Sequence, residues 1–421
     1  MNVHAYTMCA NCCYDANIMT LITIQPPSRK QASAQDCALF NLGFRPFFLG
    51  GALFAIVSIL LWIHRFFAGG MQVSLHVTPS QWHAHEMFYG YVLAIIAGFL
   101  LTAVRNWTNV PTAHGKTLAA LFGLWGAARL CMALPNAYWQ LAAWLDVLFN
   151  LGLVVSVSMP IIKAKQWRQI AVISKVLLLG AGNVLFYLGV FGVLSNGVVI
   201  SQTLALLLVL SLILVIGRRV IPFFIQRGLG LTQPLTQYKW LDISIMVLFL
   251  VWLADEVVLR SGVVSQWSCI GLFLLNGFRL ANWHHRALWK VPLLWSLYLS
   301  IWCINLGFLL YGLRDALAIT VTLPLHVFTI GGIGLITVAM MSRVSLGHTG
   351  RNIHQPPKWI AAAFVLLLAG MLFRAIMPML SASLYQYGLM LGAACWVLGF
   401  GIFVLNYAPM LVKPRIDGQP G

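Results

Sequence analysis

Residues 82–87, WHAHEM, lead directly into the unbroken apolar run FYGYVLAIIAGFLLTAV of residues 88–104, in a chain of 421 residues of which only 8% are charged. Together the two stretches are long enough for a helix that crosses a hydrocarbon core of about 30 Å. Imidazole and carboxylate side chains are costly in such a core, so they usually pair, line a cavity or bind a ligand. The sequence therefore predicts a membrane helix with a metal or haem site at its head.

The apolar character extends over the whole chain. Hydrophobic residues make up 60% of it, and its mean hydropathy is +0.86. A soluble domain of this size has too little interior to bury so much apolar surface, so most of that surface must face lipid. We therefore expect an all-α, polytopic membrane protein with about twelve transmembrane helices in one bundle. The expected spans are residues 46–67, 85–104, 117–134, 139–162, 171–193, 197–216, 240–259, 265–281, 291–312, 321–342, 359–379 and 384–411.

The formal net charge of +17 follows the predicted topology. Lys and Arg gather in every second connection between the spans, and the other connections hold almost none beyond Arg314. By the positive-inside rule the basic connections and both termini face the cytoplasm, as in a protein of a bacterial inner membrane. No compact basic domain is present to hold a duplex, so we expect no nucleic-acid partner. The basic residues are Arg105, Lys116, Lys163, Lys165, Arg168, Arg218, Arg219, Arg227, Lys239, Arg286, Lys290, Arg343, Arg351 and Lys358.

Three regions follow from this pattern. We expect residues 1–40 to form a disordered cytoplasmic tail, residues 41–412 the transmembrane domain, and residues 413–421 a second cytoplasmic tail. The first tail contains a C-x-x-C motif, which could bind a soft metal or cycle by redox, although nothing around it indicates a fold. Its cysteines are Cys9, Cys12 and Cys13.

An outer group of ionisable residues follows from the predicted topology. His83, His85 and Glu86 lie at the outer end of their span, and His326 at the outer end of the span over residues 321–342. Residues two apart on a helix point about 200° apart, so His83 and His85 cannot both ligate one ion if both are helical. One imidazole would then ligate the ion, and the other would bind a second metal or contact a carboxylate outside the coordination sphere. For His326 the alternative is a hydrogen-bonded histidine of the helix core.

The acidic residues allow several roles. Glu86 could orient an imidazole from outside the metal's coordination sphere, donate a proton, or pair with a membrane arginine. Asp146 is expected to pair with Arg129 across a short loop. Asp255 and Glu256 are expected to serve a helix end, with proton supply to the outer site as the alternative.

A separate inner site is expected from the length of one predicted helix. Arg343 lies seventeen residues after His326 on that helix, so the two residues are about 25 Å apart, too far to share one metal. His284 and His285 could turn toward one copper ion with soft methionine ligands nearby, Met340 and Met341, or they could form a wet interfacial loop. Residues 347–351, GHTGR, combine glycines, a histidine and a threonine between arginines, a pattern that suits a carboxylate, a phosphate or haem propionates. Anchoring by positive charge is the alternative.

The segment GRRVIPFF, residues 217–224, is expected to end a helix at paired arginines before a helix-stopping Pro222. It could be a second anion clamp or a charged stop at the membrane surface.

The predicted metal ligands are therefore His83, His85, His326, His284, His285 and His348. The predicted anion or propionate clamps are Arg343, Arg351, Arg218 and Arg219.

Several motifs occur together in a fixed order: NLGFRPFF at residues 41–48, WHAHEM at 82–87, FLLTAVRNWT at 99–108, GRRVIPFF at 217–224, His326, and GHTGR at 347–351. With these motifs the chain resembles the NnrS family of haem- and copper-containing membrane proteins associated with the response to nitric oxide. The resemblance extends from about residue 40 to the last predicted helix. It implies a twelve-helix bundle, bound haem and copper, and protection against nitrosative stress.

The resemblance and the residues together suggest a mechanism. A non-covalent b-type haem beside copper would offer two redox-active centres for nitric oxide, which could be bound and sensed or turned over, so enzymatic activity stays open. Glu86 is the candidate proton donor for a reduction. A secondary transporter of a small solute or metal is the main alternative. A relative of the haem-copper oxidases and nitric oxide reductases is a further one, although the adjacent His284 and His285 fall at a helix end rather than within a helix.

Overall fold

The computed structural model describes residues 37–67 and 77–419. The leader cysteines and nearly all of the expected N-terminal tail lie outside the described residues. The chain is already packed before the expected boundary at residue 41. The amide of Ala38 donates to the carbonyl oxygen of Val412 at 2.8 Å, and the ring of Phe40 contacts that of Phe122.

The described chain is built from helices. In chain order the α-helices are α1 (Phe44–Phe67), α2 (Pro79–His85), α3 (Leu93–Thr108), α4 (Gly115–Ala133), α5 (Trp139–Lys163), α6 (Ile170–Val190), α7 (Gly197–Leu229), α8 (Lys239–Ala254), α9 (Val263–Trp283), α10 (Pro292–Gly312), α11 (Thr322–His326), α12 (Leu335–His348), α13 (Ile360–Leu380) and α14 (Tyr385–Val412). Short 3₁₀ turns are η2 (Asn136–Tyr138), η3 (Trp167–Gln169), η5 (Arg286–Lys290) and η7 (Ala382–Leu384). Three π-helical segments continue α-helices: η1 (Glu86–Val92), η4 (Asp255–Leu259) and η6 (Val327–Gly334).

The expectation of an all-α, multi-pass membrane protein is confirmed, but the count of twelve spans is not. Within residues 37–67 and 77–419, nine helices are long and apolar enough to cross a membrane, with the α2–η1–α3 and α11–η6–α12 segments each counted as one. The long helices outside that set are α4, α8 and α9. They carry charged side chains such as Arg129, Asp242 and Arg279.

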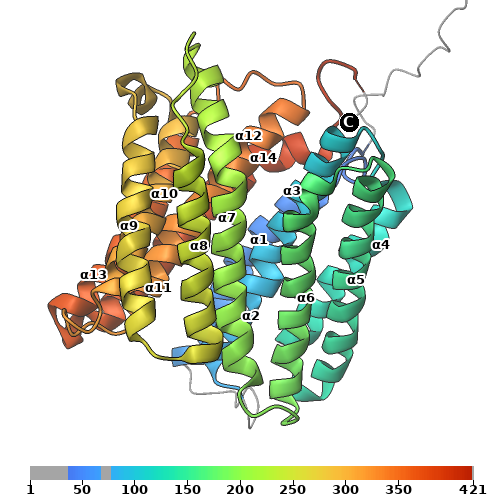
Figure 1. The fold of residues 1–421 in the computed structure, drawn as a ribbon. Helices are drawn as coiled ribbons and strands as arrows, with labels where there is room; N and C mark the ends of the chain where they lie inside the picture. The colour runs from blue at the N-terminus through green and yellow to red at the C-terminus, as the bar shows by residue number, and fades with distance from the viewer. Residues whose placement is uncertain (1–36, 68–76, 420–421) are drawn as a thin grey trace, which may run out of the picture.

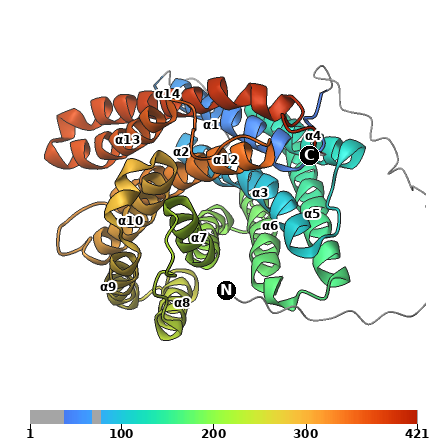
Figure 2. The same ribbon diagram turned by 90° about the horizontal axis from the view of Figure 1, so that it is seen from above.

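The long helices run between two ends of the molecule (Figure 1). We call the end at Phe67, Pro79 and Gly312 the outer end, following the predicted topology, and the end at Trp283 and His348 the inner end. Seen from above, α4, α5 and α6 gather on one side and α8, α9 and α10 on the other, with α7 between them (Figure 2). Helices α1 and α14 pack together, although they come from opposite ends of the chain.

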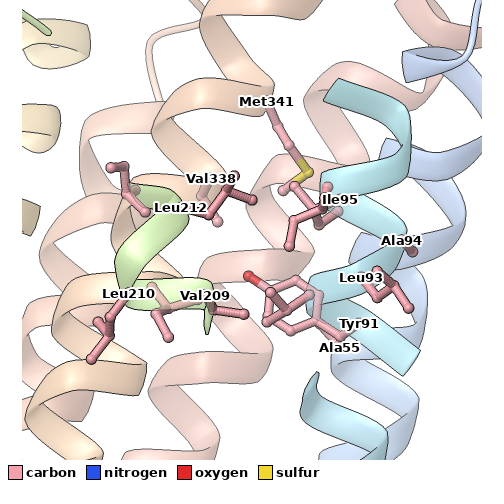
Figure 3. Packing of buried hydrophobic residues seen from close by; sticks show 14 of the residues in the cluster. Ala55, Tyr91, Leu93, Ala94, Ile95, Val209, Leu210, Leu212, Val338 and Met341 are labelled. Atoms are coloured by element: carbon pink, nitrogen blue, oxygen red, sulfur yellow. The ribbon is translucent and has the colours of Figure 1, made fainter. Parts of the chain in front are cut away.

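The interior of the bundle is apolar where η1, α3, α7 and α12 meet (Figure 3). Tyr91, Ile95, Val209, Val338 and Met341 are buried there. In lipid the backbone of each helix satisfies its own polar groups, so close side-chain packing is what holds neighbouring helices together.

The expected end of a helix at Pro222 is wrong. Helix α7 continues through Pro222 to Leu229 and then ends at Gly230 in the left-handed conformation. A proline removes only one backbone hydrogen bond, and the flanking residues Ile221 and Ile225 are buried. The packing of this last part of α7 therefore outweighs the local cost of the proline.

Arg45 joins the two ends of the chain. Its side chain is 0% exposed, and its Nη1 donates to the carbonyl oxygens of Met410, Leu411 and Lys413 at 3.2, 2.9 and 2.7 Å. The last carbonyl groups of a helix lack partners within the helix and carry partial negative charge, so a guanidinium is well suited to them. Arg45 therefore caps α14 from the first turn of α1.

We expect Arg45→Met to lower the free energy of unfolding by about 2 kcal/mol, the scale of lost hydrogen bonds to a charged group. The measurement is the thermal midpoint of the detergent-purified protein. Arg168→Met, at an exposed arginine, is the matched control and should leave the midpoint unchanged. Equal midpoints for both variants would show that the cap contributes nothing.

Candidate functional site

A cavity of about 520 Å³ lies between α1, α2, η1, α7, α8, η4, α10, α11, η6, α13 and α14. Its volume is in the range of sites that hold small molecules and cofactors, about 300–1,000 Å³. Aromatic side chains form much of its wall, including Trp62, Tyr91, Trp252 and Trp396. The polar residues on the wall are Ser80, Gln81, His83, Gln202, Thr203, Glu256, Tyr311, Thr322, His326, Thr329, Arg374 and Tyr385.

All three π-helical segments of the described chain contribute to this wall. Segment η1 supplies Met87 and Phe88, η4 supplies Glu256, and η6 supplies Thr329 and Ile330. A π-turn widens the helix and re-aims the side chains that follow, and such turns occur frequently at functional sites. Their convergence on one cavity marks it as the candidate site.

His83 faces the cavity from α2. Its ring stacks on Trp62 of α1, with centroids 4.6 Å apart and planes 27° apart. Its Nδ1 atom is buried and has no hydrogen-bond partner among the described residues. A buried polar atom without a partner is costly, which is a reason to expect that this ring serves a ligand.

His326 faces the same cavity from the end of α11. Its Nδ1 donates to the main-chain carbonyl oxygen of Thr322 at 2.6 Å. Because that nitrogen carries the proton, the lone pair of the neutral ring is at Nε2, the arrangement typical of a metal-ligating histidine. The structure therefore brings His83 and His326 to one cavity, as the sequence predicted for the outer group.

Two charged side chains of opposite sign also line the cavity. Oε1 of Glu256 accepts hydrogen bonds from Tyr311 at 2.6 Å and from Trp252 at 3.3 Å. Arg374 packs its guanidinium 5.4 Å from the ring centre of Tyr385, and none of the ion pairs among residues 37–67 and 77–419 includes it. An anionic group in the cavity could therefore pair with Arg374.

Asp255 and its neighbour Glu256 have different roles. The carboxylate of Asp255 accepts hydrogen bonds from the amides of Ser261, Gly262 and Ser265 and from both serine hydroxyls. It serves the start of α9, which is the expected helix-end role. Glu256 instead points to the cavity, so the alternative of a cavity acid applies to Glu256 alone.

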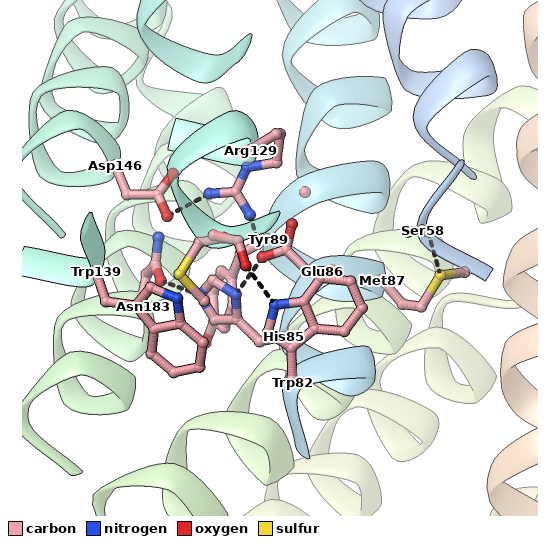
Figure 4. A network of polar contacts seen from close by, with 12 residues as sticks. Ser58, Trp82, His85, Glu86, Met87, Tyr89, Arg129, Trp139, Asp146 and Asn183 are labelled. Carbon is pink, nitrogen blue, oxygen red and sulfur yellow. Dashed lines mark hydrogen bonds and ion pairs between the residues drawn. The ribbon is translucent and has the colours of Figure 1, made fainter. Parts of the chain in front are cut away.

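His85 belongs to a second, fully buried polar network on the other face of the same helix (Figure 4). Its Nδ1 lies 2.8 Å from Oε1 of Glu86, and its Nε2 lies 2.9 Å from Oδ1 of Asn183. Its ring stacks on Phe186 at 3.9 Å. Both ring nitrogens therefore lie within hydrogen-bonding distance of protein partners, and His85 is not among the residues that line the cavity.

Arg129 joins the two carboxylates of this network. Its Nη1 donates to Glu86 at 2.6 Å, and its Nη2 donates to Asp146, which also accepts from the hydroxyl of Tyr187 at 2.7 Å. The expected pair of Arg129 and Asp146 is confirmed. Glu86 pairs with the same membrane arginine, which is one of the three roles expected for it. Glu86 does not line the cavity.

The predicted inner residues are dispersed. His284 and His285 are exposed between α9 and α10, where Nε2 of His284 accepts from Trp289 at 3.3 Å and Nδ1 of His285 accepts from the amide of Ala287 at 3.2 Å. The interfacial-loop alternative describes them better than a copper site. His348 instead packs against Phe44, with ring centroids 5.6 Å apart.

The predicted anion clamps are also apart from one another. Arg218 pairs with Asp242 at 2.9 Å, Arg219 is exposed, and Arg343 lies 4.0 Å from the ring centre of Phe224. Arg351 donates to the carbonyl oxygen of Thr349 at 3.4 Å. These contacts do not converge on one anion site.

The chain after α14 covers the inner end of α12. Arg415 donates to the carbonyl oxygen of His348 at 3.2 Å. Its hydrogen bond to Asp417 lowers the pKa of that carboxyl to about 2.

The glycines of η1 and η6 serve helix packing. A Cβ atom on Gly331 would lie 2.2 Å from Sδ of Met371, and one on Gly90 would lie 2.4 Å from the ring of Phe54. Both glycines therefore allow neighbouring helices to pack closely.

No group of three or more His, Cys, Asp or Glu side chains arranged to hold a metal ion occurs in residues 37–67 and 77–419. A metal in the cavity would thus have few protein ligands of these types.

Sequence reasoning missed Arg374, Tyr311 and Met87 as parts of the cavity wall. An arginine inside the apolar run of α13 was a usable signal, but nothing local distinguishes Tyr311.

The family model described as NnrS protein matches residues 38–415. None of the curated proteins searched matches the chain.

Proposed function

Since the chain belongs to the NnrS protein family, a family of membrane proteins of the nitric oxide response, we propose that its outer cavity holds a non-covalent b-type haem together with copper. We further propose that these metals bind nitric oxide or turn it over, and that the protein thereby protects against nitrosative stress. The observation that carries the proposal is that two imidazoles, His83 and His326, line one cavity, each with a ring nitrogen free for a ligand.

The other wall residues suit the same occupant. Aromatic rings can pack on the faces of a flat macrocycle, and Arg374 can pair with a propionate. When bound, haem and copper would supply redox-active centres for a diatomic ligand. The apolar wall would keep water away from that ligand. Nitric oxide is small and uncharged, so a site within a helix bundle needs no polar entry path.

Glu256 replaces Glu86 as the candidate acid. Its carboxyl group lies on the cavity wall beside the hydroxyl of Tyr311, so it is placed to pass a proton to the occupant. Glu86 is instead occupied by Arg129 and His85.

We expect the detergent-purified full chain to contain iron and copper and to show a Soret band that shifts when nitric oxide is added. The double variant His83→Ala/His326→Ala should lose the band and both metals, because no imidazole remains on the cavity wall. His64→Ala, at an exposed histidine outside the cavity, is the matched control. Colourless wild-type protein without iron or copper, from cells supplied with both, would contradict the proposal.

A secondary transporter of a small solute or metal is the second candidate. One observation favours it: the cavity is lined by interrupted helices and by charges of opposite sign, Glu256 and Arg374, as in sites that receive polar solutes. Uptake of a small solute or a metal ion by proteoliposomes that contain metal-free protein would support transport.

A haem-copper oxidase arrangement is not favoured, because His284 and His285 lie exposed outside the helices.

We also propose that the protein is in a bacterial inner membrane with both termini in the cytoplasm. The support is the alternation of Lys and Arg along the chain. Labelling of single cysteines introduced at Ser381 and Lys358, on opposite predicted sides, with a membrane-impermeant maleimide in intact cells tests this. Only the residue-381 variant should react.

A further inference from the structure

We infer that the two imidazoles of the cavity serve different metals: His326 ligates the haem iron, and His83 together with Met87 binds copper(I). This assignment rests on the proposed function and adds which residues hold which metal. The reasons are the different surroundings of the two rings.

His326 is held as a fixed ligand. Its Nδ1–H bond to the carbonyl oxygen of Thr322, one helical turn earlier, fixes both the tautomer and the orientation of the ring. A histidine held in this way offers its Nε2 in one direction and with raised basicity. Such a residue would suit a haem iron as a ligand.

His83 and Met87 form a pair of soft donors. They lie four residues apart at the junction of α2 and η1, so they share a helix face, and both line the cavity. The hydroxyl of Ser58 donates to Sδ of Met87 at 3.4 Å, which orients the thioether and leaves it a second lone pair. Imidazole with thioether is a donor set that selects copper(I) over harder ions.

The surroundings of His83 favour a soft, singly charged metal. Its ring is positioned by stacking on Trp62, and its buried Nδ1 has no partner among the described residues. No ion pair in residues 37–67 and 77–419 includes His83, and the carboxylate on the cavity wall, that of Glu256, is hydrogen-bonded to Tyr311 and Trp252.

The test measures haem and copper per chain in the full-length protein. The variants are His326→Ala, His83→Ala and Met87→Leu, where leucine keeps the volume but removes the sulfur. Controls are His64→Ala and Met341→Leu, the latter at a buried methionine that does not line the cavity. Copper(I) affinity is measured by competition with a chromophoric chelator, and the haem spin state by optical absorption.

We expect His326→Ala to lose haem and keep copper. His83→Ala should lose copper and keep haem in the wild-type spin state. Met87→Leu should lower the copper(I) affinity by about tenfold or more with haem unchanged, since changes in and around a coordination sphere act on that scale. The controls should match the wild type.

Two results would overturn the assignment. One is a His83→Ala protein that retains copper while its haem changes spin state, because His83 would then be an iron ligand. The other is loss of the same metal from both histidine variants. Absence of both metals from the wild type is a different outcome, since it rejects the proposed function itself.

Discussion

Arg129→Met is expected to yield little folded protein. Arg129 is the guanidinium between Glu86 and Asp146, and all three side chains are at most 3% exposed. Methionine fills a similar volume but leaves two carboxylates in the bundle with one cation fewer. Breaking a buried ion pair by removing one partner costs about 3–5 kcal/mol, and here two pairs share the partner. The measurement is the yield and thermal midpoint of monodisperse protein in detergent.

The triple variant Arg129→Met/Glu86→Gln/Asp146→Asn is the control for this prediction. It removes the cation and both anions together, so no uncompensated charge remains, and much of the lost stability should return. If the single variant is as stable as the wild type, or if the triple variant is no better than the single one, the network does not stabilise the bundle by charge pairing.

His85→Gln is expected to destabilise the protein by about 2 kcal/mol, because it removes the imidazole that contacts Glu86 and Asn183 and leaves a buried polar group without a partner. The two ring nitrogens of His85 lie 2.8 Å from Oε1 of Glu86 and 2.9 Å from Oδ1 of Asn183. The thermal midpoint in detergent measures the effect.

The effect of Glu86→Gln should depend on the residue at position 85. In the wild-type background it removes the carboxylate that contacts both His85 and Arg129, and it lowers the midpoint. In the His85→Gln background the contact with His85 is already lost, so the further loss should be smaller. Equal losses in the two backgrounds would show that His85 and Glu86 are not coupled.

The sequence alone was sufficient for the class of the protein. Long apolar runs predict helices that face lipid, because a membrane helix satisfies its own backbone and needs only a local stretch of apolar residues. The same local reasoning separated His83 from His85, since two residues on one helix point to different sides. It also paired Arg129 with Asp146, which are seventeen residues apart on neighbouring helices.

Expectations that relied on local signals alone were less successful. Pro222 was expected to end a helix, yet α7 continues past it because its last part is buried against neighbouring helices. The inner histidines were expected at a separate inner site, and Arg218 and Arg219 at a second anion clamp, from their predicted depth in the membrane. These residues lie on different helices or loops and contact different partners. The predicted depth of a residue in the membrane does not indicate which other residues it contacts.

Only the tertiary structure decided which residues make the cavity and which make the buried network. Glu256 meets Tyr311 across 55 positions of sequence, Glu86 meets Arg129 across 43, and His85 meets Asn183 across 98. Apolar helix surfaces in lipid have no strong preference among neighbours, so small residues, packing and a few buried polar contacts select the partners. The sequence thus determined the helices and the residue types at their ends. Packing determined that His83 faces a cavity while His85, two residues later, is enclosed by its own hydrogen bonds.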